Sequence, residues 1–262
     1  HFENHPEEAD RLHAEMLITV TSFFRDPESF EAVEPLLEEM ISEEDRDVLR
    51  VWSVGCASGE EAYSIAILAD EARRQRDQSG FSIQIFATDI DEESLERARR
   101  GFYSKAIEED VPEQRLERYF VETEEGYRVA ERLRDMCIFS VHDITSDPPF
   151  SRIDLAVCRN VLIYMQPDLQ SRAISLLHYA LRPGGILFLG PADTISNRKD
   201  FFETVDLEHR LFRAKDAPTA HSRILPIDFT APRRLSSFQP NGAPTRSRRE
   251  LGVTFQRHLM DQ

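Results

Sequence analysis

The stretch Val51-Trp52-Ser53-Val54-Gly55-Cys56-Ala57-Ser58-Gly59-Glu60-Glu61-Ala62-Tyr63-Ser64 determines the fold that we predict for this chain. It indicates a buried strand over 48–54, a tight loop of small residues, and a helix over 60–74 with apolar residues at helical spacing. Gly55 and Gly59 would let the backbone pass close to a ligand at the carboxyl end of the strand, where open α/β sheets bind. Their spacing differs from that of a dinucleotide-binding loop and of a P-loop, and no lysine follows.

Two glutamates, Glu60 and Glu61, occupy the first turn of this predicted helix. A helix N-terminus without acidic residues suits a phosphate, whereas two carboxylates would repel one. They suit a ligand with a cation or with hydroxyl and amino donors, such as a nucleoside that carries a sulfonium and an α-amino group. The alternative interpretation is that both glutamates only complement the helix dipole.

The composition limits the classes of function. The 262 residues suffice for one α/β domain with additional segments. A formal net charge of −16 argues against general binding of nucleic acids or anionic membranes. No apolar run approaches the ~18 residues of a membrane-spanning helix, and we find no signal peptide. Three cysteines (Cys56, Cys137 and Cys158) lie in apolar runs without zinc-site spacing, so we expect buried thiols, no metal and a cytoplasmic location.

The two ends of the chain are predicted to lie outside the main domain. A helix predicted over 6–18 makes residues 1–26 a truncated helical segment. Residues 215–262 lack periodicity over most of their length and are rich in Pro, Ser, Thr, Ala and Arg, which predicts a linker or tail. A helix could form over 248–260. The chain opens within a helical pattern, so we expect it to be a piece of a larger protein.

A short polar and aromatic segment precedes the helix predicted over 27–45. Phe23 and Phe24 are expected to pack into the core and to hold Arg25 near whatever the glycine loop binds. The alternative for Arg25 is an ion pair with Asp26 or with a surface glutamate.

The strand predicted over 81–89 ends at Asp89. In nucleotide-binding α/β folds an acid at this place accepts hydrogen bonds from the ribose hydroxyls. The alternative is that Asp89 caps the helix predicted over 91–100, but Asp91 suits that role better because Glu93 follows it. We therefore favour a ligand-binding role, with Asp89 left free for the ligand.

Residues 101–137 interrupt the alternation of strands and helices. A short helix over 115–120 is followed by two short strands around the turn Glu124-Glu125-Gly126. This pattern predicts a small antiparallel β-subdomain inserted at about 113–137, of the kind that often carries partner recognition.

The alternation then resumes and predicts a doubly wound α/β sheet for residues 27–214. The remaining strands are predicted over 137–141, 153–158, 186–190 and 210–213, the last antiparallel to a strand near Thr204, with a helix over 167–181.

Four polar residues are predicted to follow parallel strands beside the Gly55 loop, where they would share one crevice. They are Asp89, Asp143, Arg159 and Asn160. No Ser-His-Asp order is visible, and His142 is the only histidine at a strand end, so a histidine base stays open. A donor that brings its own leaving group, such as S-adenosylmethionine, needs few catalytic side chains, because the enzyme mainly aligns the reacting atoms.

Six segments between about 15 and 213 resemble one family. They are Thr21-Ser22-Phe23-Phe24-Arg25, Trp52 to Ala66, Ala87-Thr88-Asp89-Ile90-Asp91, Ala98 to Tyr103, Cys158-Arg159-Asn160-Val161-Leu162-Ile163-Tyr164 and Leu181 to Gly185. The chain resembles the chemotaxis receptor methyltransferases (CheR), which transfer a methyl group from S-adenosylmethionine to glutamate side chains of chemoreceptors. This resemblance implies a Rossmann-like methyltransferase sheet with a small antiparallel β-subdomain and a short N-terminal helical remnant.

The resemblance also implies a set of cofactor-binding residues. They are Thr19, Thr21, Arg25, Gly55, Glu61, Asp89, Asp143, Ile144, Arg159 and Asn160. Within the set, Glu61 should face the amino-acid portion of the cofactor and Asp89 the ribose hydroxyls, while Asp143 and Ile144 border the adenine. S-adenosylhomocysteine would be the product.

Arg25 and Tyr164 are the catalytic residues that the resemblance implies. Arg25 should lie closest to the transferring methyl group, and Arg159 and Tyr164 near the methionine moiety and the acceptor. An ionised carboxylate is already a nucleophile, so no general base or metal is needed. Arg25 and Tyr164 can donate hydrogen bonds that orient it in line with the sulfonium.

The chain departs from the family pattern at several positions. Only about 20 residues precede the Phe-Phe-Arg run, Thr19 and Asp143 replace expected asparagines, and Pro191-Ala192-Asp193 replaces His-Ser-Glu. The turn at 122–126 is short and acidic, so we expect no tethering by a receptor pentapeptide. The trailing linker resembles fused members, in which this domain lies between a methylesterase module and sensory modules of the PAS type.

We therefore predict a protein-glutamate O-methyltransferase whose partner is the cytoplasmic domain of a methyl-accepting chemoreceptor. Two alternatives stay open. The first is a sensory module that binds S-adenosylmethionine or S-adenosylhomocysteine without methyl transfer, and the second is a methyltransferase acting on a small molecule. Turnover would exclude the first, and methylation confined to protein glutamates would count against the second.

Overall fold

The computed structural model describes residues 21–43, 46–78, 80–195 and 200–216, all within the compact unit His1–Ile227. The expected helices over 6–18 and 248–260 and nearly all of the expected tail lie outside the described residues. In chain order the elements are α2 (Pro27–Ile41), β1 (Val48–Val54), α3 (Glu60–Gln75), β2 (Ser82–Asp89), α4 (Glu92–Arg100), β3 (Phe102–Ser104), η2 (Lys105–Glu109), α5 (Glu113–Tyr119), β4 (Phe120–Glu122), β5 (Gly126–Val129), α6 (Glu131–Arg134), β6 (Cys137–Val141), β7 (Ile153–Cys158), η3 (Leu162–Tyr164), α7 (Pro167–Ala180), β8 (Leu181–Leu189), β9 (Phe202–Asp206) and β10 (Leu211–Ala214).

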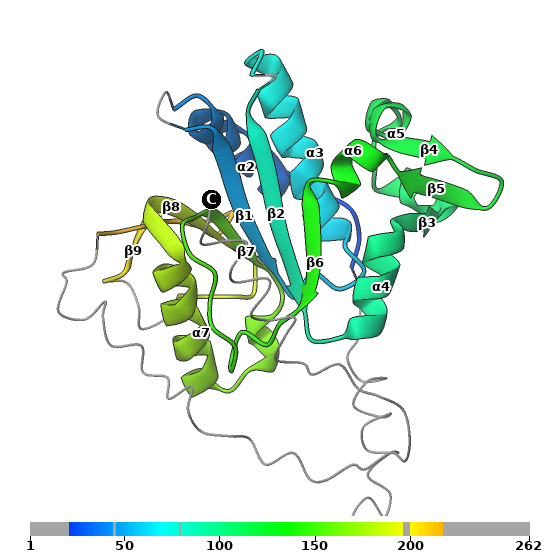
Figure 1. Ribbon diagram of the computed structural model, residues 1–262. Coiled ribbons are helices and arrows are strands. Elements are labelled where there is room, and N and C mark those ends of the chain that lie inside the picture. The colour runs from blue at the N-terminus through cyan, green and yellow to red at the C-terminus, as the bar shows by residue number, and fades with distance from the viewer. Residues whose placement is uncertain (1–20, 44–45, 79, 196–199, 217–262) are drawn as a thin grey trace, which may run out of the picture. The chain divides into compact units, whose positions relative to one another are not determined.

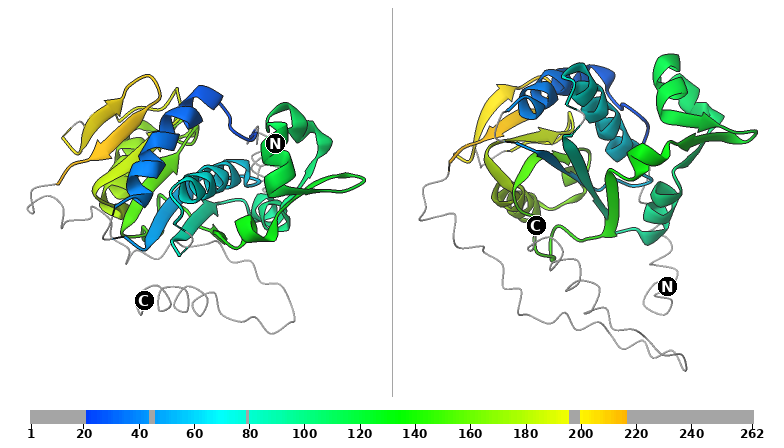
Figure 2. Two further views of the ribbon diagram at one scale, coloured as in Figure 1. Left: turned by 90° about the horizontal axis from the view of Figure 1, so that it is seen from above. Right: turned by 45° about the horizontal axis from the view of Figure 1, so that its top comes forward.

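A seven-stranded sheet with the order β6-β2-β1-β7-β8-β10-β9 forms the centre (Figure 1). The first five of these strands are parallel, and β10 pairs antiparallel with both β8 and β9. Helices α2 and α3 pack together on one face, and α7 covers the other (Figure 2). The predicted doubly wound α/β sheet is confirmed. Because β2 and β7 flank β1 on opposite sides, the strand order reverses at β1, and ligands bind at such switch points.

The strands that carry the core were predictable because they are buried on both faces and are therefore continuously apolar. Strand β1 buries Leu49, Val51 and Trp52 completely, and β7 is buried along its whole length. The bounds of β1, β6 and β7 are those that the sequence predicted. Helix α2 ends at Ile41 rather than 45, where the N–H of Ser42 donates to the carbonyls of Glu38 and Glu39.

Two features of the sheets differ from the prediction. Strand β8 begins at Leu181 and includes residues 182–185, where a turn was expected, and its register against β7 shifts between Leu181 and Ile186. The small sheet has three strands in the order β3-β5-β4, so it begins at Phe102, before the predicted start at about 113. Strand β3 is too short to show periodicity, and it approaches β5 so closely that a Cβ on Gly126 would lie 2.1 Å from the carbonyl oxygen of Tyr103.

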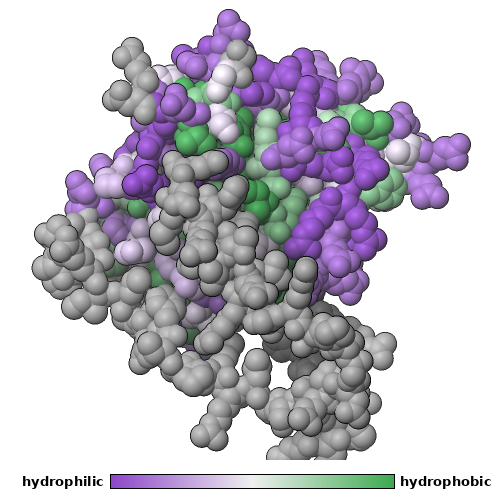
Figure 3. Space-filling model, viewed as in Figure 1, coloured by the Kyte–Doolittle hydropathy of each residue, from purple (hydrophilic) through white to green (hydrophobic). Residues whose placement is uncertain are grey.

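The surface of the described part is mainly hydrophilic on the side shown in Figure 3, as expected for a chain with 31% charged residues. Among the described residues, no helix combines the length and the apolar character needed to cross a membrane.

All three thiols are buried and none forms a disulfide, as the sequence predicted. Burial raises the pKa of Cys56, Cys137 and Cys158 well above the ordinary thiol value. Each side chain is therefore a protonated thiol at neutral pH, which is the unreactive form.

Candidate functional site

The loop after β1 is tied to the end of β2. The N–H groups of Gly55 and Cys56 both donate to the carbonyl oxygen of Thr88, at 2.7 and 3.0 Å. Gly55 has a φ of +69°, and a Cβ there would lie 2.4 Å from Cγ2 of Val161. A Cβ on Gly59 would lie 2.8 Å from Cβ of Ala98. The glycines therefore let other chain segments approach the loop, whereas the sequence suggested approach of a ligand; Gly55 remains a predicted cofactor contact through its backbone.

Asp89 connects this loop to the start of α4. Its Oδ2 accepts from the N–H of Ala57 at 2.8 Å and its Oδ1 from the N–H of Asp91 at 2.9 Å. Asp91 caps α4, as predicted, by accepting from the N–H of Glu93. The expectation that Asp89 is free for a ligand is therefore corrected, because it already holds two backbone groups. A carboxylate has about four acceptor positions, so Asp89 keeps capacity for two hydroxyl donors.

The two glutamates at the start of α3 differ in their surroundings. Glu60 accepts from the hydroxyl of Ser58 in its own loop, at 2.8 and 3.0 Å. Glu61 is half-buried and accepts from the hydroxyl of Ser53 on β1 at 2.8 Å. Burial raises the pKa of Glu61 to about 7, although the positive charge of Arg159 opposes this. A carboxylate whose burial outweighs the nearby positive charges is suited to receive a cationic group of a ligand.

The Phe23–Asp26 loop (residues 23 to 26) is anchored as the sequence predicted. Phe23 is 2% and Phe24 4% exposed, and the ring of Phe23 meets those of Tyr103 and Phe120 edge-on. The N–H of Phe24 donates to the hydroxyl of Ser64 on α3, at 3.0 Å. Between these anchors and α2, the side chain of Arg25 is exposed. The loop thus presents Arg25 next to the first turns of α3.

Arg159, at the end of β7, is buried to a degree that the sequence did not suggest. Its side chain is 2% exposed, and Nη2 forms an ion pair with Oδ2 of Asp26 at 2.6 Å. Its guanidinium carbon lies 5.1 Å from the ring centroid of Phe30 and 4.8 Å from that of Phe188. The expected contact of Arg159 with the cofactor stays a prediction, and its contacts with protein groups were not foreseen from the sequence.

Asp193 is a buried residue that sequence reasoning did not place at the site. Its Oδ2 accepts from the N–H of Asn160 at 2.7 Å and from that of Gly190 at 3.1 Å. It thereby fixes Asn160, which has a left-handed φ of +59°. The sequence feature that could have indicated a role for Asp193 is its place in the Pro191-Ala192-Asp193 triplet, which stands where the family often has His-Ser-Glu.

Of the remaining predicted residues, Asp143 and Ile144 follow β6 at its carboxyl end. The carboxylate of Asp143 organises the turn after β6, where it accepts from the N–H and hydroxyl of Thr145 and from the hydroxyl of Ser146. Ile144 is buried behind this turn, and Tyr164 on η3 is 64% exposed. Thr21 is half-buried beside the Phe23–Asp26 loop, and Thr19 lies outside the described residues.

His142, the candidate histidine base, packs against other residues. Its ring meets Trp52 edge-on at 5.4 Å, and its Nε2 lies 2.9 Å from the carbonyl oxygen of Pro148. In the parts of the chain that the structure describes, no three His, Cys, Asp or Glu side chains gather as a metal site would require.

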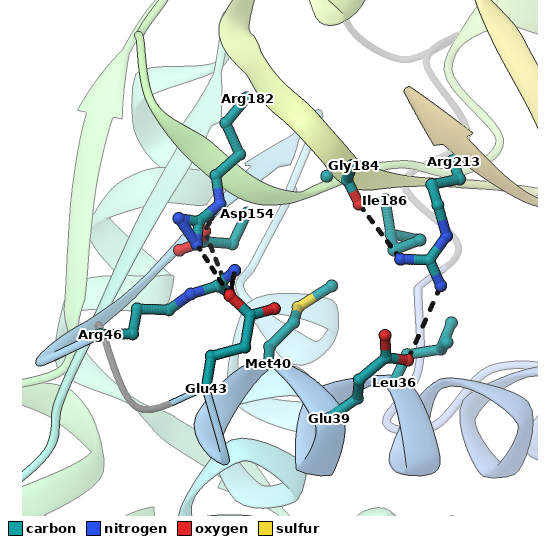
Figure 4. A pocket seen from close by; sticks show the side chains of 11 residues that line it. Leu36, Glu39, Met40, Glu43, Arg46, Asp154, Arg182, Gly184, Ile186 and Arg213 are labelled. Carbon is teal, nitrogen blue, oxygen red and sulfur yellow. Dashed lines mark hydrogen bonds and ion pairs between the residues drawn. The ribbon is translucent and has the colours of Figure 1, made fainter. Parts of the chain in front are cut away.

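A second polar cluster lies at the opposite, amino-terminal end of the parallel strands (Figure 4). Asp154 on β7 is 2% exposed and receives Nε of Arg182 at 2.5 Å, Nη1 of Arg46 at 3.3 Å and the N–H of Arg50 at 2.7 Å. Glu43, just after α2, pairs with Arg46 and Arg182. This cluster joins α2, β1, β7 and β8, and it lies away from the end where α/β sheets bind ligands.

Comparisons with known proteins identify the family of this chain. A family model described as "CheR methyltransferase, SAM binding domain" matches residues 19–211. An uncharacterised 104.1 kDa protein of Rhodobacter capsulatus is 42% identical over 205 residues, which are 78% of this chain and 21% of that protein. A chemotaxis protein methyltransferase of Listeria monocytogenes is 34% identical over 184 residues, or 70% of this chain and 68% of that protein. Chemotaxis protein methyltransferase 1 of Pseudomonas aeruginosa is 32% identical over 206 residues, or 76% of this chain and 75% of that protein. The chain thus spans about a fifth of the first relative and about two thirds to three quarters of the other two.

Proposed function

This chain belongs to the CheR family of S-adenosylmethionine-dependent methyltransferases, and we propose that it methylates glutamate side chains of chemoreceptors. Its domain would span 27–214, and S-adenosylhomocysteine would be released as product. The observation that carries the proposal is the placement of Glu61, Asp89 and Arg25 around the loop at the switch point of the sheet.

The residues at the loop fit this cofactor. The half-buried carboxylate of Glu61 would receive the α-ammonium group, since that cation supplies the counterion the carboxylate needs. The remaining acceptor positions of Asp89 would receive the ribose hydroxyls. Thr19, Thr21, Asp143, Ile144, Arg159 and Asn160 complete the proposed cofactor site.

Two exposed donors are suited to bind the acceptor. When bound, the cofactor supplies an activated methyl group and its own leaving group. Arg25 and Tyr164 would each donate a hydrogen bond to the acceptor carboxylate and hold one of its oxygens in line for attack. Because an ionised carboxylate is already nucleophilic, the chain needs no base here, which agrees with the packed position of His142.

The pH dependence of cofactor binding follows from Glu61. Its pKa of about 7 in the free protein means that it is mostly protonated at about pH 6 and mostly ionised at about pH 7.5. Only the ionised form attracts an ammonium group, so affinity for S-adenosylhomocysteine should rise several-fold over this interval. Arg159 and Arg25 favour the ionised form and Asp193 opposes it.

Titration calorimetry at both pH values measures this effect. Repeating it near pH 7 in two buffers of different ionisation enthalpy should show release of a fraction of a proton. The Glu61→Gln variant should bind more weakly and without this pH dependence; an unchanged pH profile in that variant would refute the role of Glu61.

Asp89→Ala should weaken cofactor binding by about 1–3 kcal/mol, the usual cost of leaving polar partners unpaired. The adjacent Asp91 is the matched control, because it caps α4 without a proposed ligand role. Asp91→Ala should lower the stability of the helix and leave the dissociation constant of S-adenosylhomocysteine within about threefold of wild type, since a lost cap costs only about 1 kcal/mol. Equal losses of affinity in both variants would contradict the assignment of Asp89.

The proposed function is tested in two steps. Calorimetry with S-adenosylmethionine and S-adenosylhomocysteine asks whether the pocket binds, and a folded protein that binds neither at millimolar concentration would refute the proposal. Labelled S-adenosylmethionine is then offered with a panel of recombinant cytoplasmic chemoreceptor fragments. Base-labile label on receptor glutamates supports the proposal. Cofactor binding with no label on any fragment would favour the sensory module, and label confined to small molecules would favour the third hypothesis.

The acceptor would be reached in the cytoplasm without a pentapeptide tether. The short acidic turn between β4 and β5 supports this part of the proposal. The much greater length of the Rhodobacter capsulatus relative supports fusion of such domains to further modules, among which we propose methylesterase or PAS-type modules.

A further inference from the structure

Asp26 does not play the role that its position predicts. An aspartate immediately before a helix normally has extended backbone angles and caps the helix with its side chain. Here Asp26 has a left-handed φ of +60°, and its side chain makes no capping hydrogen bond with α2. It is directed instead to Arg159, which lies 133 residues further along the chain.

Arg159 is held in place by more than this ion pair. Its planar guanidinium lies over the rings of both Phe30 on α2 and Phe188 on β8, and cations favour the faces of aromatic rings. The two rings also meet each other edge-on at 5.7 Å. Because the guanidinium is buried, loss of its carboxylate partner would leave its desolvated charge less well compensated, with only the carboxylates of Glu61 and Asp193 acting on it among the charges described. The side chain of Arg159 is therefore held rigidly, and the Phe23–Asp26 loop is bound to it through Asp26.

The Phe23–Asp26 loop, which contributes Asp26 to the ion pair with Arg159, has a strained backbone. Phe24 has a φ of +50° and Asp26 a φ of +60°, so left-handed residues other than glycine flank Arg25 on both sides. Such conformations persist only where surrounding contacts enforce them. Contacts that hold this loop include the burial of Phe24, its N–H bond to Ser64, and the ion pair of Asp26. On the side of Arg25 that leads into α2, the N–H of Ser29 donates to the backbone carbonyl of Asp26 at 2.9 Å, and the ion pair is the contact that restrains the Asp26 side chain.

We propose that Asp26 and Arg159 are a positioning pair, which fixes the Phe23–Asp26 loop so that Arg25 is aimed at the acceptor carboxylate. This inference rests on the proposed function, because it assigns the pair a part in methyl transfer. Asp26 needs to touch neither cofactor nor acceptor, and Arg159 keeps its place in the proposed cofactor site. The pair acts through Arg25, so its loss should affect alignment of the acceptor more than binding of the cofactor, which depends on Glu61 and Asp89.

The test uses Asp26→Asn, since asparagine tolerates the left-handed conformation and removes only the charge. Asp26→Glu is the conservative rescue, and Glu28→Gln is the control, because Glu28 is an exposed acid in the first turn of the same helix. Three quantities are measured: amide hydrogen exchange over residues 22–30, the dissociation constant of S-adenosylhomocysteine, and kcat with the chemoreceptor fragment that the wild-type protein methylates.

Asp26→Asn should speed exchange at the Phe24 amide and lower kcat on the order of ten- to a hundredfold, the usual effect of a small misplacement of a reacting group. The dissociation constant should stay within about threefold of wild type, because the cofactor contacts are unchanged. Asp26→Glu should recover part of kcat, and Glu28→Gln should behave as wild type.

Hydrogen exchange at the wild-type rate in Asp26→Asn would overturn the proposal. Faster exchange with an unchanged kcat would also overturn it, because the pair would then stabilise the loop without affecting methyl transfer. An equal loss of kcat in Glu28→Gln would also overturn it, since the effect would then be one of helix charge. If the wild-type protein binds no S-adenosylhomocysteine, the proposed function fails. The exchange measurement would still decide whether the pair holds the loop.

Discussion

Replacing Arg25 by alanine is expected to abolish methyl transfer while the protein remains folded. Arg25 is exposed, between the buried Phe24 and the start of α2, so its side chain contributes little to the core. Its proposed task is to bind and orient the acceptor carboxylate with a charge-assisted hydrogen bond. We expect kcat to fall by at least about a hundredfold, because alignment of the nucleophile supplies much of the rate enhancement in such reactions.

The measurement is label transfer to a receptor fragment at saturating S-adenosylmethionine. Thermal unfolding of the same samples should show a midpoint close to wild type. Arg100→Ala is the matched control, because Arg100 is an exposed arginine on α4, where it forms only a long i,i+4 pair with Glu96. Full activity of Arg25→Ala would refute the catalytic assignment, and unfolding of that variant would show that the loop is needed for the core.

Replacing Asp154 by alanine is expected to cause the largest loss of stability. Asp154 is the buried acceptor for Arg182, Arg46 and the N–H of Arg50. The side chain of Arg46 is only 11% exposed, so its charge would lose its buried partner. Removing one member of a buried ion pair usually costs about 3–5 kcal/mol, since the remaining charge stays desolvated.

Urea unfolding measures the free energy of unfolding for this variant and two others. Asp154→Asn should lose less, because its amide oxygen can still accept from the N–H of Arg50; it also serves if the alanine variant fails to fold. Glu43→Ala is the control, because Glu43 reaches the same arginines but is 50% exposed. It should cost less than about 1 kcal/mol, as exposed pairs do. Similar losses in Asp154→Ala and Glu43→Ala would show that burial does not determine the energy of this cluster.

The sequence was sufficient for the sheet and for the edge at which the site lies. Buried parallel strands are continuously apolar, and the polar residues that follow them, Asp89, Asp143 and Arg159, must meet at one edge. The Asp91 cap, which acts over a few residues, was also predictable, because local spacing determines it.

Contacts between distant segments could not be predicted from the sequence. Nothing near Asp26 indicates that its partner is Arg159, and nothing near Gly55 indicates that Val161 occupies the place of a side chain. Strand β3 depends on pairing with β5 more than twenty residues later, and Asp193 acts on the backbone of Asn160. Each of these needs the assembled sheet, because the partners meet only after the strands have paired.

The burial of Cys56, Cys137 and Cys158 has a practical consequence for measuring the binding of this protein to the chemoreceptor that we propose as its partner. A maleimide reacts with an exposed thiolate, and the native side chains offer none. A cysteine introduced at Leu207, which is 62% exposed in the turn after β9, would therefore take up a fluorophore selectively. The native thiols can stay in place, and fluorescence anisotropy of the labelled protein would report docking without any change to the residues of the crevice.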